Sequence, residues 1–192
     1  MTFTNWRRKI SCYKYSFLEL LALKTNLFYK ILMDMRKPVF EKEIKIAKVT
    51  EKDKVLFIGG GIFPSESILM AELTNAKIVT IDNSKTACKH AKAYIQKKKL
   101  SENVIVEYGD GVNYPVKDFD VIFIAISVWP IDNVFQNLSK NVKVNTRVLC
   151  KTYRSDIVSV FKNKNFAKDF YLKEKLENPK TQSFLFVKKS KD

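Results

Sequence analysis

The feature that most constrains the fold is an alternation of short apolar runs and helical stretches after residue 53. The apolar runs are rich in β-branched residues and lack strict in–out alternation, which is typical of strands covered on both faces. Repeated strand–helix units of this kind predict a parallel, doubly wound sheet. The predicted strands are Val55–Ile58, Ile78–Ile81, Val104–Glu107, Val121–Ile126 and Arg147–Cys150, and the predicted helices are Ser65–Thr74, Ser84–Lys98, Ile131–Leu138 and Ser155–Lys162.

The end of the chain departs from this alternation. Phe170–Leu176 and Ser183–Lys188 both have strand character, and the turn-like sequence Glu177-Asn178-Pro179-Lys180 joins them. Because no helix fits between these two strands, we expect them to pair as an antiparallel hairpin. The sequence therefore predicts an α/β fold with a seven-stranded sheet that ends in a hairpin.

The first quarter of the chain has a different pattern. Apolar residues recur at helical spacing from Tyr13 to Met35, and Pro38 should end that helix or begin the next segment. Phe40–Val49 is predicted to be a second, short helix. We therefore expect a helical N-terminal extension over residues 1–50 and an α/β domain over residues 51–192.

The composition is ordinary except for its charge, with 35 basic and 20 acidic residues and a net charge of +15. Such a surplus favours contact with nucleic acid, an anionic membrane or an acidic substrate, and it fits a merely Lys-rich surface equally well. The longest apolar stretch begins at Phe17 and is interrupted by Glu19, Lys24 and Lys30. We therefore expect no transmembrane segment.

The cysteines and the histidine limit the chemistry further. Cys12, Cys88 and Cys150 lie far apart, without the spacing of metal ligands or of a redox pair, and His90 is the only histidine. This pattern argues against a zinc site and favours a reducing compartment, which we interpret as the cytoplasm.

A glycine-rich turn, Gly59-Gly60-Gly61, separates the first predicted strand from its helix. Glycines adopt unusual backbone angles and let a ligand approach the main chain closely. Pro64 fits the start of the following helix and Ser65 can cap it, and the helix N-terminus favours a carboxylate or another anion. Because Pro64 replaces the last glycine of G-x-G-x-x-G, and no G-K-[ST] follows, the turn matches neither the dinucleotide nor the phosphate-loop pattern.

Acidic residues follow the next two predicted strands. Asp82 ends the second strand, where a carboxylate can accept hydrogen bonds from both ribose hydroxyls of a nucleoside. Since Asn83 and Ser84 can cap the next helix, Asp82 is free for that role. Asp110 lies between two glycines after the third strand, where it can bind an adenine amino group or have only a structural role in the turn.

The segment after the fourth predicted strand should face the reacting group. Ser127 is the polar side chain nearest to the end of the strand, and Trp129 can form one wall of a pocket. The segment holds no Asp, Glu, His or Cys that is placed as an obvious base. The sequence therefore leaves the catalytic residues unidentified.

Taken in order, these features resemble the class I S-adenosylmethionine-dependent methyltransferases over about residues 50–190. The resemblance implies a Rossmann-like fold and S-adenosyl-L-methionine as the cofactor. Gly59, Gly60 and Gly61 would surround its methionine part, Asp82 would hold the ribose, and Asp110 would bind the adenine. The other cofactor-binding positions expected beside these are Pro64, Asn83, Gly111, Ile126 and Ser127.

A narrower resemblance concerns residues 59–68, which are similar to the glycine loop of nicotianamine synthases. Those enzymes share the fold and the cofactor, but they transfer the aminocarboxypropyl group instead of the methyl group. Their helical N-terminal domain, which is longer than the extension here, contributes to the substrate pocket and carries a catalytic glutamate. The N-terminal carboxylates of this chain cannot be aligned with that glutamate from the sequence; they are Glu19, Asp34, Glu41 and Glu43.

We therefore expect an S-adenosylmethionine-dependent transferase, with methyl transfer to a small molecule favoured. Positioning of the cofactor and the acceptor supplies much of the rate enhancement, and a base is needed only when the acceptor must lose a proton. An amine or a nitrogen heterocycle is therefore a suitable acceptor. Three alternatives stay open: aminocarboxypropyl transfer, cofactor binding without turnover, and RNA methylation. The RNA alternative depends on the net charge and on two basic clusters, residues 6–9 and 97–99.

Overall fold

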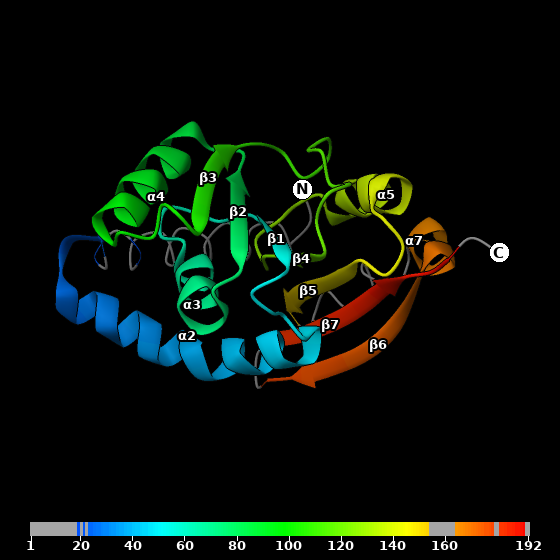
Figure 1. Ribbon diagram of the computed structural model, residues 1–192, viewed down its shortest axis with the longest axis horizontal. Helices are drawn as coiled ribbons and strands as arrows, with labels where there is room; N and C mark the ends of the chain where they lie inside the picture. Colours follow the sequence, from blue (N-terminus) through cyan, green and yellow to red (C-terminus); the bar gives the residue numbers. More distant parts are fainter. Residues whose placement is uncertain (1–18, 20, 22, 154–163, 179–180, 191–192) are drawn as a thin grey trace, which may run out of the picture.

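The computed structural model describes residues 19, 21, 23–153, 164–178 and 181–190. Across these residues the chain forms one seven-stranded sheet with the order β3-β2-β1-β4-β5-β7-β6 (Figure 1). The strands are β1 (Lys54–Ile58), β2 (Lys77–Asp82), β3 (Val104–Tyr108), β4 (Val121–Ile124), β5 (Arg147–Tyr153), β6 (Phe170–Glu177) and β7 (Thr181–Lys188). The first five strands are parallel, whereas β7 is antiparallel to both β5 and β6. The predicted α/β fold and its terminal hairpin are confirmed.

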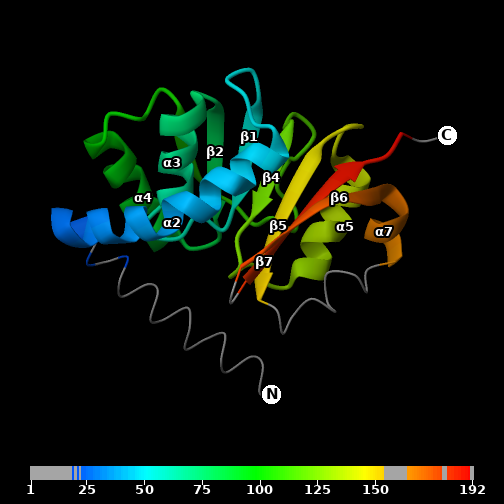
Figure 2. The same cartoon turned by 90° about the horizontal axis from the view of Figure 1, so that it is seen from below.

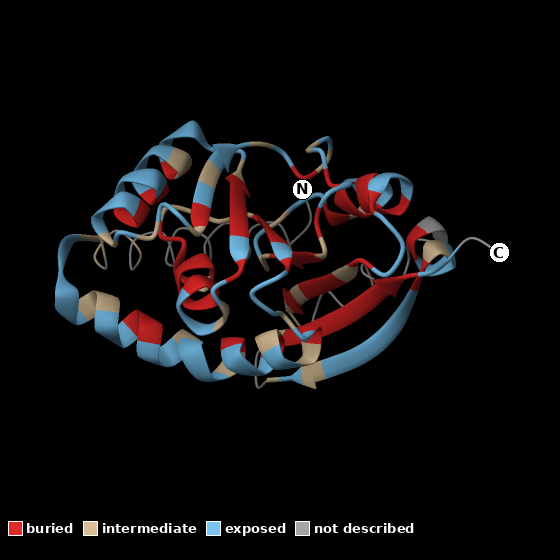
Figure 3. Ribbon diagram, viewed as in Figure 1, coloured by how far each residue is buried: buried red, intermediate tan, exposed pale blue. Residues whose placement is uncertain are grey.

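Helices cover both faces of the sheet. One core lies between the sheet and α2 (Asn26–Ala47), α3 (Ser65–Thr74) and α4 (Lys85–Lys97), and a second core lies under α5 (Ile131–Asn141) and α7 (Lys164–Asp169). The central strands are accordingly buried on both faces, while the outer faces of the helices are exposed (Figure 3). The short helix α7 was not predicted, and the helix predicted at residues 155–162 lies outside the described residues. Within the described part of the chain, no helix is both long and apolar enough to cross a membrane.

The prediction that a helix ends near Pro38 is wrong. Helix α2 runs unbroken for 22 residues with Pro38 inside it, although proline removes one helical hydrogen bond. The buried side chains Leu32 and Phe40 lie on either side of Pro38 and pack into the same core. This packing stabilises the helix across the proline. Helix α2 begins after Thr25, whose side chain caps the helix by accepting a hydrogen bond from the Phe28 N–H.

The position of α2 matters for the site. Figure 2 shows α2 running past α3 toward β5, so that it lies along the sheet face near the glycine turn. Tyr29 on α2 packs edge-on against Phe63, which follows the glycine turn, with 5.9 Å between the ring centroids. Phe40, two residues after Pro38, contacts the aromatic pair Phe57 and Phe123 of the central strands. Aromatic contacts therefore fix α2 over the carboxyl end of β1.

Candidate functional site

The glycine turn after β1 has a conformation that requires glycine. Gly59 and Gly61 have φ values of +89° and +68°, which L side chains rarely adopt. A Cβ atom at Gly59 would lie 2.7 Å from Val128 Cγ2, and one at Gly60 would collide with Thr80 Cγ2. The turn is therefore pressed between β2 and the segment after β4, which leaves its outer side for a ligand.

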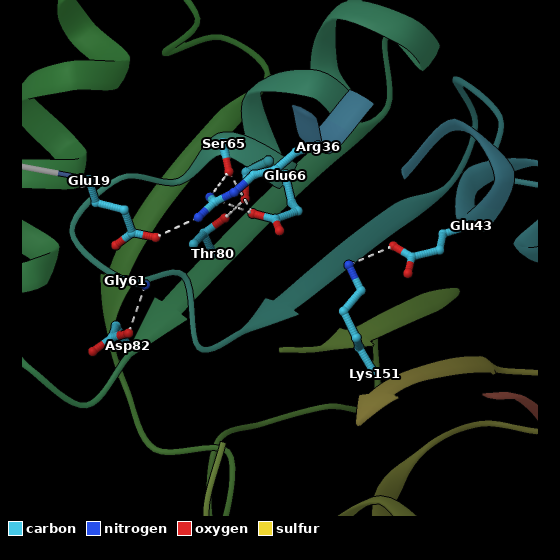
Figure 4. A network of polar contacts seen from close by, with 10 residues as sticks. Glu19, Arg36, Glu43, Gly61, Ser65, Glu66, Thr80, Asp82 and Lys151 are labelled. Atoms are coloured by element: carbon cyan, nitrogen blue, oxygen red, sulfur yellow. Dashed lines mark hydrogen bonds and ion pairs between the residues drawn. The ribbon is translucent and has the colours of Figure 1, made fainter. Parts of the chain in front are cut away.

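Asp82 holds this turn from the end of β2. Its Oδ2 accepts a hydrogen bond from the Gly61 N–H at 2.8 Å (Figure 4), and its Oδ1 accepts one from the Ser84 N–H at 2.9 Å. Ser84 caps α4 by accepting from the Ala87 N–H, so Asp82 is not the helix cap. Because each carboxylate oxygen can accept a second hydrogen bond, Asp82 can still bind both hydroxyls of a ribose.

Asp110 and Gly111 shape the turn after β3. Asp110 Oδ1 accepts a hydrogen bond from the Val112 N–H at 3.0 Å, as expected of a turn residue. The Gly111 carbonyl accepts from Asn137 Nδ2 at 2.9 Å, and a Cβ atom at Gly111 would lie 2.6 Å from Ile58 Cγ2. Asp110 thus has a structural role, and its Oδ2 stays available to an adenine amino group.

The remaining predicted positions gather at the same edge. Pro64 is buried and occupies the N-cap of α3, so the prediction that Ser65 caps this helix is wrong. Asn83 is exposed beside Asp82. Ser127 is exposed in the segment after β4, with its Oγ 3.9 Å from the place where a Gly59 Cβ would be, and the half-buried Ile126 precedes it. Four adjacent strands, β3, β2, β1 and β4, therefore bring the predicted cofactor positions together.

A network centred on Arg36 of α2 lies over the glycine turn, and the sequence did not predict it. Arg36 Nη2 donates to Glu19 Oε1 at 3.0 Å, while its Nη1 donates to Ser65 Oγ and lies 3.5 Å from Glu66 Oε2 (Figure 4). Glu19 Oε2 is 3.4 Å from the position of a Gly61 Cβ. The guanidinium therefore joins the N-terminal segment to the start of α3.

The two carboxyl groups of this network titrate in opposite directions. Burial raises the pKa of Glu19, and this effect outweighs the attraction of Arg36. Burial would also raise the pKa of Glu66, but Arg36, Lys151 and the Ser65 hydroxyl lower it to about 2. Glu19 is thus the carboxylate better suited to accept a proton, while Glu66 stays ionised.

A second polar cluster joins α2 to the sheet. Glu43 is fully buried, and its Oε2 lies 3.0 Å from Lys151 Nζ on β5 while its Oε1 accepts from Ser183 Oγ on β7 at 2.5 Å. Burial raises the pKa of Glu43, although Lys151 opposes the shift. One sequence signal existed: Glu43 shares the helical stripe of Phe40 and Ala47, both buried. Lys151 therefore points inward to α2.

Comparison with known proteins identifies the family of this chain. The model of the protein-L-isoaspartate(D-aspartate) O-methyltransferase (PCMT) family matches residues 39–167, which is more than half of the chain. The chain belongs to this family. The predicted resemblance to S-adenosylmethionine-dependent methyltransferases is thereby confirmed, as are the transferase class and S-adenosyl-L-methionine as the cofactor. No curated protein matches the chain.

Solved structures show the same fold. A point mutant of MtNAS, a nicotianamine synthase, in complex with S-adenosylmethionine has a TM-score of 0.80 at 18% identity, covering 95% of this chain and 76% of that one. An RNA methyltransferase from Salinibacter ruber with S-adenosyl-L-homocysteine has a TM-score of 0.67 at 14% identity, covering 81% and 94%. A methyltransferase from Pyrococcus furiosus has a TM-score of 0.65 at 16% identity, covering 81% and 83%. The fold is therefore of the class I methyltransferase type.

Proposed function

We propose that this chain is a methyltransferase that acts on a small-molecule amine bound between the glycine turn and α2. The observation that carries this proposal is Glu19, a largely buried carboxyl group with a raised pKa that lies over Gly61. A carboxylate in such a place can take the proton that an ammonium group must lose before its nitrogen attacks.

The cofactor-binding edge supplies the first half of the mechanism. When bound, S-adenosyl-L-methionine offers an activated methyl group on its sulfonium. Asp82 would hold the ribose and Asp110 the adenine, and the glycine turn admits the amino-acid end close to the main chain. The Gly61 N–H and the Ser84 N–H orient the Asp82 carboxylate before any ligand arrives.

The region under α2 supplies the second half. Among the described residues, three carboxylates, Glu19, Glu43 and Glu66, pair with two cations, Arg36 and Lys151, which gives these five residues a net negative charge in a strongly basic chain. Such a net charge favours a cationic amine over an anionic acceptor. Arg36 binds Glu19 Oε1 and leaves Oε2 on the side of the glycine turn, where it can receive the amine proton.

Aminocarboxypropyl transfer is the second candidate. The likeness to MtNAS favours it, because that likeness covers 95% of this chain. The two reactions leave different by-products from the same cofactor. Methyl transfer leaves S-adenosylhomocysteine, whereas aminocarboxypropyl transfer leaves methylthioadenosine.

The RNA alternative has less support. Of its two basic clusters, residues 6–9 lie outside the described residues. In the other, Lys98 Nζ lies 3.6 Å from the centroid of the Tyr29 ring and also near Tyr94. This lysine stabilises the contact between α2 and α4, which gives it a structural role.

The scattered cysteines favour a reducing compartment, so we place the reaction in the cytoplasm.

The test is a by-product assay by mass spectrometry with S-adenosylmethionine and a panel of small primary and secondary amines. We expect S-adenosylhomocysteine to form, and Glu19→Gln to lower kcat by about 10²-fold or more while cofactor affinity stays unchanged. The acidic limb of the kcat/KM profile should also disappear in this variant. Formation of methylthioadenosine would establish the second candidate, and consumption of the cofactor only with RNA would refute an amine acceptor.

A further inference from the structure

A cavity lies at the edge of the sheet opposite to the cofactor-binding edge. It has a volume of about 450 Å³ and opens beside the amino ends of β4 and β5, the end of β7 and the start of β6. Volumes of this size are typical of sites for small ligands. Four basic side chains and a single acidic one, Asp120, line the cavity; the basic ones are Lys48, Lys143, Arg147 and Lys173.

Two of these four cations have no counter-ion among the described residues. Lys143 Nζ lies 2.6 Å from Asp120, and Arg147 forms an ion pair with Asp53. Lys48 and Lys173 have no ion pair with any residue that the structure describes. The cavity therefore holds at least two uncompensated positive charges, which favours an anionic ligand.

The end of helix α2 would ordinarily disfavour an anion here, because the last carbonyl groups of a helix carry partial negative charge. Arg147 removes this obstacle. Its Nη1 donates to the Ala47 carbonyl at 2.7 Å and to the Lys48 carbonyl at 2.6 Å. The guanidinium thus satisfies the last carbonyl groups of α2, so these groups do not require the Lys48 ammonium.

The edge strand β6 is irregular at the cavity. The register of the β6–β7 pair shifts between Leu172 and Glu174, so Lys173 is the extra residue of a β-bulge. Bulges redirect a side chain and are frequent beside ligand sites. This irregularity gives Lys173, which lines the cavity, a position outside the regular ladder.

The cavity also has an apolar wall. Tyr171 and Val144 line it, and their exposures are 46% and 47%, large for hydrophobic residues. An aromatic face next to lysines suits a ligand that combines a flat ring with a phosphate group. Phosphate oxygens accept strong, charge-assisted hydrogen bonds from ammonium groups.

From these observations we infer that the cavity binds a phosphorylated nucleotide as a small ligand, at a site separate from that of the cofactor. The phosphate lies between Lys48 and Lys173, and the base lies against Tyr171. This site requires neither cofactor binding nor turnover, so its test can fail while the proposed function holds, and the reverse.

The test uses UMP as the probe and isothermal titration calorimetry on the full chain saturated with S-adenosylhomocysteine, which keeps the probe from the adenosine position. We expect UMP to bind, and Lys48→Asn combined with Lys173→Ala to weaken it by about 100-fold, about tenfold for each charged hydrogen bond. Asparagine suits position 48 because Lys48 has a φ of +50°. Tyr171→Ala should weaken UMP while leaving inorganic phosphate binding unchanged.

A matched control removes two exposed lysines of α4, with Lys89→Asn and Lys92→Ala, and should leave the affinity for UMP unchanged. Equal losses in the control and in the cavity variant would overturn the site, because they would reflect net charge alone. Absence of UMP binding to the wild-type chain would overturn it directly. A uridine oligonucleotide that binds much more tightly than UMP would assign the cavity to RNA and would also refute the inference.

Discussion

The cofactor-binding edge and the region under α2 differ in how the chain builds them. At the cofactor-binding edge, each residue ends or closely follows its own strand, and Asp82 accepts hydrogen bonds from the backbone of the glycine turn and of Ser84. Under α2, the partners come from distant parts of the chain, as in the bond from Ser183 to Glu43, 140 positions apart. The residues of the nucleoside part can thus be located from the ends of single strands, whereas the part that would bind the acceptor depends on contacts between α2 and distant segments.

The largest expected effect concerns the cofactor-binding edge. Asp82→Ala should weaken binding of S-adenosylhomocysteine by at least about 100-fold, because two hydrogen bonds to a charged group are lost. Isothermal titration calorimetry measures the loss, and circular dichroism confirms that the variant folds. Asp118→Ala, a change at an exposed carboxylate that precedes β4, is the control and should bind normally. Unchanged affinity in Asp82→Ala would remove the nucleoside assignment.

The next effect concerns the region under α2. Lys151→Met leaves the Glu43 carboxylate buried without its cation, which should lower the free energy of unfolding by about 3–5 kcal/mol at pH 7. Urea unfolding measures this change. The double variant with Glu43→Leu should recover most of the loss, because it removes the stranded charge as well. A double variant no more stable than Lys151→Met would show that the pair does not act as a unit.

These two regions also explain what the sequence could predict. The strands, the glycine turn and Asp82 follow from local pattern, and the structure places them as expected. The continuity of α2 through Pro38 could not be predicted, because the packing of Phe40 against the central strands decides it. The role of Arg36 could not be predicted either, since its partners lie 17 to 30 positions away.

A smaller effect tests how tightly the glycine turn is packed. Gly60→Ala should lower the free energy of unfolding by about 1–3 kcal/mol, because the new methyl group would collide with Thr80 Cγ2. Adding Thr80→Ser removes that methyl carbon and keeps a hydroxyl for Ser67, 2.6 Å away, so it should restore much of the stability. Thermal unfolding of the three variants measures both steps. Failure of the serine to rescue Gly60→Ala would mean that this contact does not limit the turn.

The last effect is a pH dependence under α2. The pKa of Glu66 is about 2 in the folded chain, below the ordinary value of 4.5, so its ionised form stabilises the fold above pH 4.5. This contribution is lost as the pH falls from 4.5 toward 2. The difference in unfolding free energy between the wild type and Glu66→Gln should therefore shrink across this range in urea titrations. A difference that stays constant with pH would contradict the ion pair with Arg36.

A crystal structure of the chain with S-adenosylhomocysteine and UMP together would test both sites most directly. We expect the ribose hydroxyls on Asp82, the adenine beside Asp110, and the homocysteine end at the glycine turn below Glu19. UMP should occupy the opposite edge, between Lys48 and Lys173. If the nucleoside of the cofactor product bound away from Asp82, this edge would not be the cofactor site.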